Sequence, residues 1–193
     1  DGYSDEWKEE AMRRGLTNIS HVPEAIMRFN DSQSREVLIG ENIFNENELI
    51  CRIEVELEKF TKKVQIESRV LGDLAINHIV PTAVIYQNRL LENLRGLRET
   101  FSQVEYEMLG ADRRELVKEI QFRILEIKQL VREMTEARRI SNRLTSQVEK
   151  AYSYEEKVRP YMEQIREHID HLELEIDDEI WPLPKYRELL FTK

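Results

Sequence analysis

The chain has 193 residues, which is enough for one large domain or two small ones, and we expect a single compact unit with a substantial core. Charged residues make up 35% and hydrophobic residues 40%, with 6 glycines and 5 prolines, so long helices are favoured and an all-β sandwich or barrel is excluded. The formal net charge of -9 argues against broad attraction to phosphate backbones or anionic lipids, so we expect neither nucleic acid nor a membrane as a partner.

Residues 1–44 are predicted to form short helices joined by irregular connections. Ser4 is a suitable N-cap for a first helix, which Gly15 can end in the left-handed conformation. The stretch 16–23 is expected to be irregular, because the proline at its end forces extended geometry on the residue before it. Residues 23–40 indicate one or two further helical turns.

A long helix is predicted from Asn45, where Glu48 completes a capping box. A seven-residue repeat places an apolar seam on it, with Glu67 as a polar interruption and His78 as the next seam position: Ile50, Ile53, Leu57, Phe60, Val64, Leu71 and Leu74. Gly72 inside this helix suggests a neighbouring backbone close by. Pro81 must kink or break the helix, because it removes a helical hydrogen bond.

Helical spacing resumes after the proline and continues to Phe101. The segment 102–111 is interpreted as the turn of a helical hairpin, and Asp112 with Glu115 as the capping box of a second long helix that reaches residue 144. A third long helix is predicted from about residue 151 to Asp178, with Pro160 as a possible bend.

These elements predict an all-α fold: an elongated antiparallel bundle of three long helices, the first kinked at Pro81, with short N-terminal helices and a short C-terminal helix. We divide the chain into residues 1–44, a long-helix bundle over 45–180 and an apolar tail over 181–193. The tail carries several large apolar side chains that need a docking surface, either on the bundle or on a neighbouring subunit: Trp181, Leu183, Leu189, Leu190 and Phe191.

The number of cysteines and the hydropathy pattern indicate the cellular compartment of the protein. A single cysteine, Cys51, excludes an intrachain disulfide, which is normal in a reducing compartment. No apolar run approaches the length of a membrane span, and the first ten residues are acidic where a signal peptide would be basic. We therefore expect a cytoplasmic protein. The chain also lacks an initiator methionine, which suggests a piece of a longer protein.

Candidate reactive and metal-binding residues do not form a recognisable site. The glycines are too far apart for a phosphate-binding loop, and Cys51 is interpreted as a structural, partly buried residue. His168 and His171 have helical metal-ligand spacing, with Glu167, Asp170 and Glu175 nearby, but two imidazoles are not a site and the acidic stretch is more simply a solvated surface. His78 is interpreted as a hydrogen-bonded buried histidine, against the alternative of a proton sensor.

The other polar patterns favour structural roles. The three arginine pairs lie among carboxylates and are interpreted as surface ion pairs rather than phosphate contacts: Arg13-Arg14, Arg113-Arg114 and Arg138-Arg139. Tyr152, Tyr154 and Tyr161 have core spacing. Glu67 and Asp73 are expected to be partnered polar residues, not a catalytic pair. We therefore predict no catalytic, cofactor-binding or metal-binding residue in this chain, and contact of its apolar faces with more protein.

Several stretches of the chain resemble the carboxy-terminal region of type III glutamine synthetases, over nearly its whole length. They are Gly15-Leu16-Thr17-Asn18, Pro23-Glu24-Ala25, Leu57-Glu58-Lys59-Phe60, Gln65-Ile66-Glu67-Ser68-Arg69 and Ile180-Trp181-Pro182-Leu183-Pro184-Lys185-Tyr186. These stretches are helix faces and connections, so they carry no catalytic signature.

The resemblance implies a ligase of glutamine biosynthesis in nitrogen metabolism, which joins glutamate and ammonia with ATP and Mg or Mn. It implies subunits assembled as stacked rings, catalytic residues upstream of this segment, and residues 1–44 as the junction to that catalytic part. It also implies that Lys193 lies at or near the natural end. This chain would then be inactive alone and would serve subunit packing or architecture.

The alternative is a free-standing helical interaction module that lays an apolar helix face against a partner helix. The native reading frame separates the two hypotheses. A gene that begins close to Asp1 would remove most of the support for the enzyme.

Overall fold

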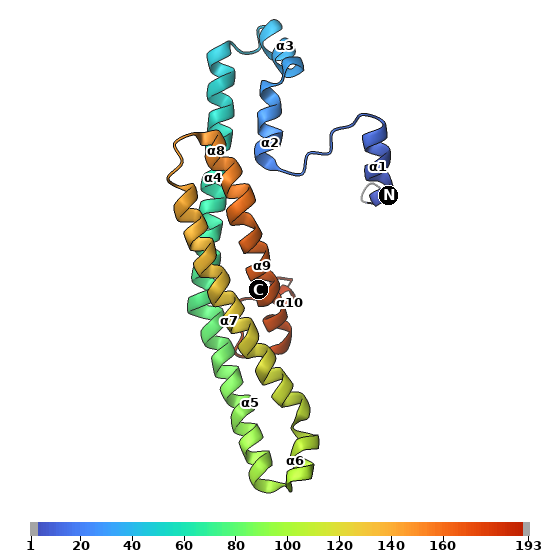
Figure 1. Cartoon of the computed structure of the whole chain (residues 1–193), viewed down its shortest axis with the longest axis vertical. Coiled ribbons are helices and arrows are strands. Elements are labelled where there is room, and N and C mark those ends of the chain that lie inside the picture. Colours follow the sequence, from blue (N-terminus) through green and yellow to red (C-terminus); the bar gives the residue numbers. More distant parts are fainter. Residues whose placement is uncertain (1–3, 191–193) are drawn as a thin grey trace. The chain divides into compact units, whose positions relative to one another are not determined.

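The computed structural model describes residues 4–190, and every regular element in that range is a helix (Figure 1). The predicted all-α class is therefore confirmed. The chain divides into two compact units, which we describe separately: unit 1 comprises Asp1–Gln65 and Ile140–Glu156, and unit 2 comprises Ile66–Arg139 and Lys157–Lys193. Between residues 4 and 190, no helix combines the length and the apolar character needed to cross a bilayer.

The short N-terminal helices lie in unit 1, as predicted. Helix α1 (Asp5–Arg13) begins at Ser4, whose side chain accepts a hydrogen bond from the Trp7 backbone N–H at 3.3 Å, and Gly15 follows it at a φ of 75°. Helix α2 (Val22–Met27) carries a proline in its first turn and continues as a 3-10 turn, η1 (Arg28–Asn30). Helix α3 (Ser32–Gly40) completes this region.

The core of unit 1 forms where these short helices meet α4 (Glu46–Leu74) and α8 (Gln147–Ser153). The capping box at the start of α4 is confirmed, since the Glu48 N–H donates to Asn45 Oδ1 at 3.0 Å and the Asn45 N–H donates to Glu48 Oε2 at 2.8 Å. Leu49, Ile53 and Leu57 are buried, and the apolar side chains of α2 and α3 pack against them.

The predicted seam of α4 was wrong at its start. Leu49 is fully buried where Ile50 was expected, and Ile50 is exposed. Thr61 and Ser68 also lie on the buried face, and the Thr61 hydroxyl donates to the Leu57 carbonyl at 2.9 Å. The seven-residue repeat counted only apolar side chains, so it omitted two small polar residues that bury well when their hydroxyls find a partner.

The predicted interruption at Pro81 is confirmed and has a defined form. A π-helical turn, η2 (Ala75–Ile79), separates α4 from α5 (Val80–Thr100), and the Val80 N–H bonds to the Ala75 carbonyl. Pro81 thus falls in the first turn of α5, where a missing N–H is tolerated. The wider turn places Ile79 in the core and leaves His78 exposed, so the predicted buried histidine was wrong.

The expected hairpin turn at residues 102–111 is itself largely helical. Helix α6 (Gln103–Leu109) begins with a capping box between Ser102 and Glu105, and α7 (Ala111–Ser141) follows after Gly110. The Ser102 hydroxyl donates to Glu105 Oε2 at 2.6 Å, which lowers the pKa of that carboxyl. Asp112 lies inside α7, so its predicted role as an N-cap was wrong, because the Ser102 box supplies the helix start in this region.

The third long helix is interrupted in the same manner as the first. Helix α8 leads into a second π-helical turn, η3 (Tyr154–Val158), and α9 (Arg159–Glu175) carries Pro160 in its first turn. In unit 2 the long helices α5, α7 and α9 alternate in direction along the chain (Figure 1), as the antiparallel prediction required. Their buried side chains include Ile120, Ile127 and Ile165.

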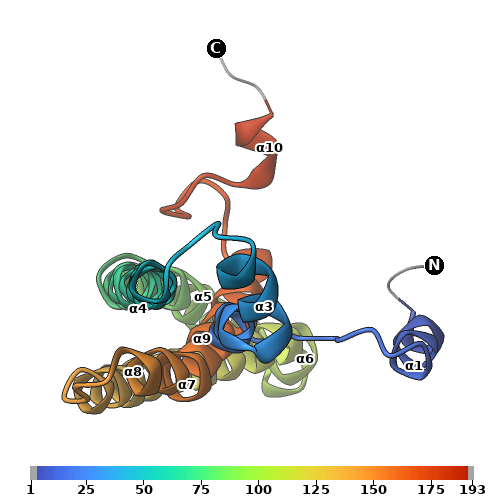
Figure 2. The same ribbon diagram turned by 90° about the horizontal axis from the view of Figure 1, so that it is seen from above.

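The tail contains the short C-terminal helix that was expected, α10 (Tyr186–Leu189). Trp181 is buried, whereas Leu189 and Leu190 are exposed. Figure 2 shows α10 standing apart from α9. Phe191, the last residue of the predicted apolar tail, lies outside the described residues.

Candidate interaction surfaces

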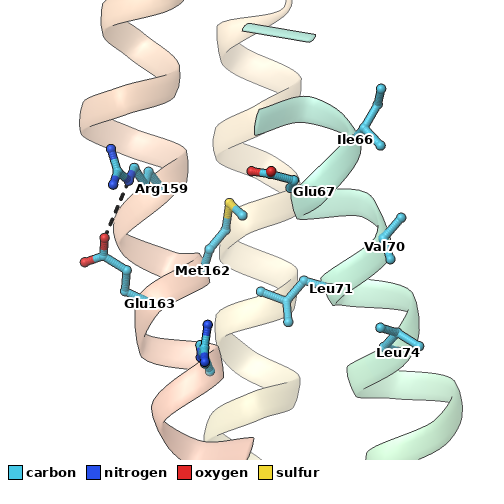
Figure 3. Close-up of a pocket in the computed structure, with 9 residues that line it drawn as sticks. Ile66, Glu67, Val70, Leu71, Leu74, Arg159, Met162 and Glu163 are labelled. Carbon is cyan, nitrogen blue, oxygen red and sulfur yellow. Dashed lines mark ion pairs between the residues drawn. The ribbon is translucent and has the colours of Figure 1, made fainter. Parts of the chain in front are cut away.

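An apolar groove lies between α4 and α9 in unit 2, with a volume of about 570 Å³ (Figure 3). Its apolar walls are Ile66, Val70, Leu71 and Leu74 of α4 and Met162 of α9. Ile66, Val70 and Leu74 recur every four residues, so they share a helix face beside the buried one. We call this feature the α4–α9 groove.

Charged side chains line the rim of the α4–α9 groove. Glu67 stands on the α4 side, and Arg159, Glu163 and Arg166 stand on the α9 side. Arg159 pairs with Glu163 at 3.6 Å, as the dashed line in Figure 3 marks. Such exposed pairs within one helix contribute little to stability.

A second hollow of about 340 Å³ continues along α9 from the α4–α9 groove. It shares Glu163 and Arg166 with the groove and extends through Glu167, Asp170 and His171 to Leu174. Leu174 is exposed. The second hollow therefore follows α9 almost to its C-terminal end, and charged or polar side chains line it up to Leu174. We call this part the α9 extension.

A further apolar surface surrounds α6, at the corner between α5 and α7. Val104 and Met108 are 79% and 70% exposed, and they lie four residues apart on one face of α6. Phe101 and Leu109 flank them and are exposed as well. We call these four residues the α6 patch. Large exposed apolar patches are common at surfaces that bind other molecules.

Glu155, which was not singled out from the sequence, is a buried carboxylate in unit 1. Its side chain is 4% exposed, and its Oε1 lies 3.0 Å from His21 Nδ1. The π-helical turn η3 carries Glu155 on the same side as the buried Ala151 and Tyr154. Nothing in the local sequence indicates this pair, because 134 residues separate its members.

Tyr154 lies in the core, as its spacing predicts, and it also belongs to a polar network. It is fully buried, and its hydroxyl donates to Asn142 Oδ1 at 2.8 Å. Gln65 of α4 donates to the same oxygen at 3.2 Å. Nearby in the chain, the buried hydroxyls of Ser141 and Ser153 lie 2.8 Å apart. Tyr152 and Tyr161 are half-buried.

His168 and His171 lie on α9 in different surroundings. Arg123 Nη1 donates to His168 Nδ1 at 3.2 Å, so this nitrogen is the acceptor and the ring is neutral, because a guanidinium has no lone pair to offer. Burial, and next the charge of Arg123, lower the pKa of His168 below 6.5. His171 is exposed in the α9 extension. Within residues 4–190, no three His, Cys, Asp or Glu side chains are grouped to hold a metal ion.

Two of the remaining candidates need correction. Cys51 is exposed, not partly buried, because the seam of α4 passes through Leu49 and Ile53 and leaves it on the outer face. Glu67 is exposed at the groove rim, and Ser68 takes the seam position that was assigned to it. Asp73 has a partner as predicted, since Asn77 Nδ2 donates to its carboxylate at 2.6 Å.

The arginine pairs divide into two kinds. Arg13 and Arg14 both pair with Glu10, and Arg139 pairs with Glu136 at 2.8 Å, so surface ion pairing is confirmed for these three. The pair Arg113-Arg114 instead donates to backbone carbonyls at the end of α6. Arg114 bonds the carbonyls of Tyr106 and Glu107 at 3.2 and 2.8 Å, and Arg113 bonds that of Leu109 at 3.2 Å. Carbonyls at a helix end attract cations in this way.

Comparison with known proteins identifies relatives along the entire chain. The family described as "Glutamine synthetase C-terminal domain" matches residues 1–98. The chain is 72% identical over 193 residues to a glutamine synthetase of Bacteroides fragilis and 30% identical over 199 aligned residues to the type-3 glutamine synthetase of Dictyostelium discoideum. In each case all of this chain aligns to 26% of the relative. A glutamine synthetase of Butyrivibrio fibrisolvens is 30% identical over 93 residues, which is 48% of this chain and 13% of that protein.

The chain therefore spans about a quarter of the length of the two relatives that align to all of it. The family match covers the short N-terminal helices, α4, η2 and most of α5. Together, these matches show that the chain belongs to the family of glutamine synthetase C-terminal domains.

Proposed function

We propose that this chain is the helical C-terminal region of a type III glutamine synthetase, a cytoplasmic enzyme that ligates ammonia to glutamate with ATP and a divalent metal. The observation that carries the proposal is the 72% identity along the whole chain to 26% of a glutamine synthetase. The alignment of the whole chain to a protein named type-3 glutamine synthetase supports the type. The remaining three-quarters of such a protein would contain the reaction centre.

The described residues offer no group of side chains suited to a divalent metal. Such a metal needs several carboxylate or imidazole ligands around one point, and residues 4–190 hold no such group. His168, the best-placed imidazole, has its Nδ1 engaged by Arg123. We therefore derive no catalytic step from these residues, and we propose that ATP and Mg or Mn bind in the rest of the enzyme.

The proposed role of this region is subunit packing or architecture in a homo-oligomer, with stacked rings as the expected assembly. The α6 patch supports this role, because exposed apolar clusters are costly in water and become favourable when another protein covers them. Residues 1–44 would form the junction to the catalytic part, residues 45–180 the packing helices and residues 181–193 the apolar tail.

Calorimetry tests whether the ATP-binding site lies outside this chain. The isolated chain, titrated with ATP and magnesium, should give no binding heat, whereas the whole enzyme should bind. Micromolar, magnesium-dependent binding of ATP by the isolated chain would contradict the proposal that the nucleotide site lies in the rest of the protein.

Mutation of the α6 patch tests the packing role. In the whole protein, Val104→Asp with Met108→Asp places charges on the exposed apolar face and should shift the oligomer to smaller species in multi-angle light scattering. Gln103→Asp is the matched control, because it adds a charge to the same helix at an exposed polar position. An unchanged mass of the double variant at all concentrations would show that the patch does not pack against another subunit.

A further inference from the structure

Helix α1 ends in a Schellman motif, which turns the chain back on the helix. The Gly15 N–H donates to the Met12 carbonyl at 3.0 Å. The Leu16 N–H donates to the Ala11 carbonyl at 2.9 Å, and Gly15 takes the left-handed conformation that the motif requires. Leu16 is thereby brought back beside Ala11, and Trp7 lies one turn before Ala11 on the same side of the helix. We call these three residues, Trp7, Ala11 and Leu16, the α1 face.

The polar groups of α1 find their partners inside the helix itself. Glu10 pairs with Arg13 and Arg14 at 2.6 and 2.7 Å. Across the described part of the chain, every hydrogen bond and ion pair of α1 joins two residues between 4 and 16. The described side chains that pack in the core of unit 1 belong to α2, α3, α4, α8 and the α3–α4 connection, and none belongs to α1. Nothing in unit 1 therefore fixes α1 in place.

The α1 face is open to water in the described chain. Trp7 and Leu16 are 39% and 53% exposed, and the Trp7 indole N–H donates to no group among residues 4–190. Helices shorter than about 12–15 residues are marginal in water by themselves, and α1 has nine residues. Helix α1 therefore needs a covering surface that is apolar and offers a hydrogen-bond acceptor to the indole.

Covalent connection places the larger part of the enzyme at α1. This step rests on the proposed function, in which the catalytic part precedes residue 1. Only four residues stand before Asp5, where α1 begins, and four residues span about 14 Å at most. On the other side, residues 16–20 have no regular structure, and His21 after them is held on Glu155 at 3.0 Å. The shorter tether of α1 thus leads to the catalytic part, and the longer one leads to unit 1.

We propose that the α1 face packs on the catalytic part of its own subunit. Helix α1 then belongs structurally to that part, and residues 16–20 form the boundary at which the helical region begins. The contact between His21 and Glu155 fixes the point where this connection meets the core of unit 1. Another subunit and the helices of unit 1 are the competing surfaces for α1.

A photocrosslink from position 7 tests the proposal in the whole enzyme. Trp7→benzoylphenylalanine is introduced, oligomers are assembled from isotopically light and heavy subunits, and crosslinked peptides are identified by mass spectrometry. The expected products join position 7 to a segment that precedes residue 1, in the same isotopic form. Products of mixed isotopic form would assign the α1 face to another subunit, and products with residues 16–193 would assign it to the helical region. Either result overturns the proposal.

Glu9 is the control position for the crosslink. It is exposed and lies on the side of α1 opposite the α1 face, so Glu9→benzoylphenylalanine should give a yield about tenfold lower. Equal yields at the two positions would contradict docking through the α1 face. Formation of glutamine by the unmodified enzyme tests the proposed function separately, so an active enzyme without the expected crosslink rejects only the docking of α1.

Cleavage of the native whole enzyme by trypsin provides the second measurement. Trp7→Ala should raise the rate of cleavage after Arg13 and Arg14 by about tenfold, because an undocked α1 unfolds locally. Glu9→Ala is the matched control and should leave the rate unchanged. Alanine favours the helix at both positions, so intrinsic fraying of α1 does not produce this difference. Equal cleavage rates in the two variants would show that the indole is not covered.

Discussion

At the scale of single residues, two hydrogen-bonded contacts join segments that are distant in the sequence. The Glu155 carboxylate is buried and lies beside His21, which precedes α2. A buried carboxylate is tolerated when its oxygens accept hydrogen bonds, so the pair ties the connection before α2 to the third long helix. Arg123 performs a comparable task in unit 2, where it bridges Glu119 at 2.8 Å and His168 at 3.2 Å.

Replacement of His21 should destabilise the chain. His21→Ala removes a hydrogen-bond partner of a buried carboxylate, and we expect a loss of about 1–3 kcal/mol in the free energy of unfolding. Urea denaturation of the isolated chain measures it. His171→Ala is the matched control, because His171 is exposed, and it should change the stability by less than about 0.5 kcal/mol. Equal losses in the two variants would show that the His21–Glu155 contact contributes nothing.

His168 makes the stability of unit 2 depend on pH. Its pKa is lowered by burial and by the charge of Arg123, so the unfolded chain binds a proton more readily than the folded chain. The stability linked to neutral His168 is complete above its ordinary pKa of 6.5 and is lost as the pH falls below that value.

Denaturation at several pH values therefore checks the protonation of His168. Between pH 7 and pH 5, the wild-type chain should lose more stability than His168→Gln, whose amide can still accept from Arg123 but does not titrate. Identical pH profiles for the two proteins would contradict the lowered pKa of His168.

At the scale of elements, two local backbone features shape the long helices. The first is the π-helical turn that precedes Pro81 and Pro160, which lets each proline stand in the first turn of a new helix while the chain remains helical. The second is glycine. A Cβ at Gly110 would lie 3.0 Å from Leu94 Cδ2 and from the Tyr106 carbonyl oxygen, so a side chain at the α6–α7 corner would require these neighbours to shift.

Gly72 differs from Gly110, and this difference leads to a prediction. A Cβ at Gly72 would lie 3.5 Å from Met134 Cε and Val131 Cγ1, which is ordinary contact with side chains and not with the neighbouring backbone that the sequence suggested. Gly72→Ala should therefore raise the stability by about 1 kcal/mol through helix propensity and added contact.

Thermal denaturation of three glycine variants separates these effects. Gly96→Ala has open space around the new Cβ and reports propensity alone, so its gain should be no larger than that of Gly72→Ala. Gly72→Leu should be destabilising, because Met134 is fully buried and there is no room for a larger side chain. A loss of stability in Gly72→Ala would show that the helices approach more closely than 3.5 Å allows.

At the scale of the whole molecule, the chain holds together by apolar packing and a few polar contacts between helices. Unit 1 closes around Leu49, Ile53 and Leu57. Unit 2 closes around the buried face of α7, and Gln87 of α5 donates to the Val117 carbonyl at 3.0 Å. The tail adds Trp181, whose indole is buried at the end of this unit.

Truncation after Asp178 tests the contribution of the tail. It removes a buried tryptophan, which is worth about 3–5 kcal/mol, and should lower the melting temperature by about 6 °C or more. Truncation after Lys185 retains Trp181 and the hydrogen bond from Lys185 to the Glu173 carbonyl, so its effect should be smaller. An unchanged melting temperature together with an unchanged oligomeric mass after the first truncation would contradict docking of the tail.

The sequence by itself determined several helix boundaries and the order of the long helices. The caps at Ser4 and Asn45 and the interruption at Pro81 act over one turn of backbone, so residues close in the chain are sufficient to specify them. It also determined the family, because the matching stretches are local patterns of residues. The capping box at Ser102 is also local, but the interpretation of residues 102–111 as a turn does not include it.

Only the tertiary structure decided which faces are buried and which polar groups meet. Leu49 rather than Ile50 enters the core because α2 and α3 pack on that side, and the register change at η2 exposes His78. Glu155 finds His21 across 134 residues of sequence. Burial depends on which segments come together in space, and a helical repeat specifies a face without specifying its neighbour.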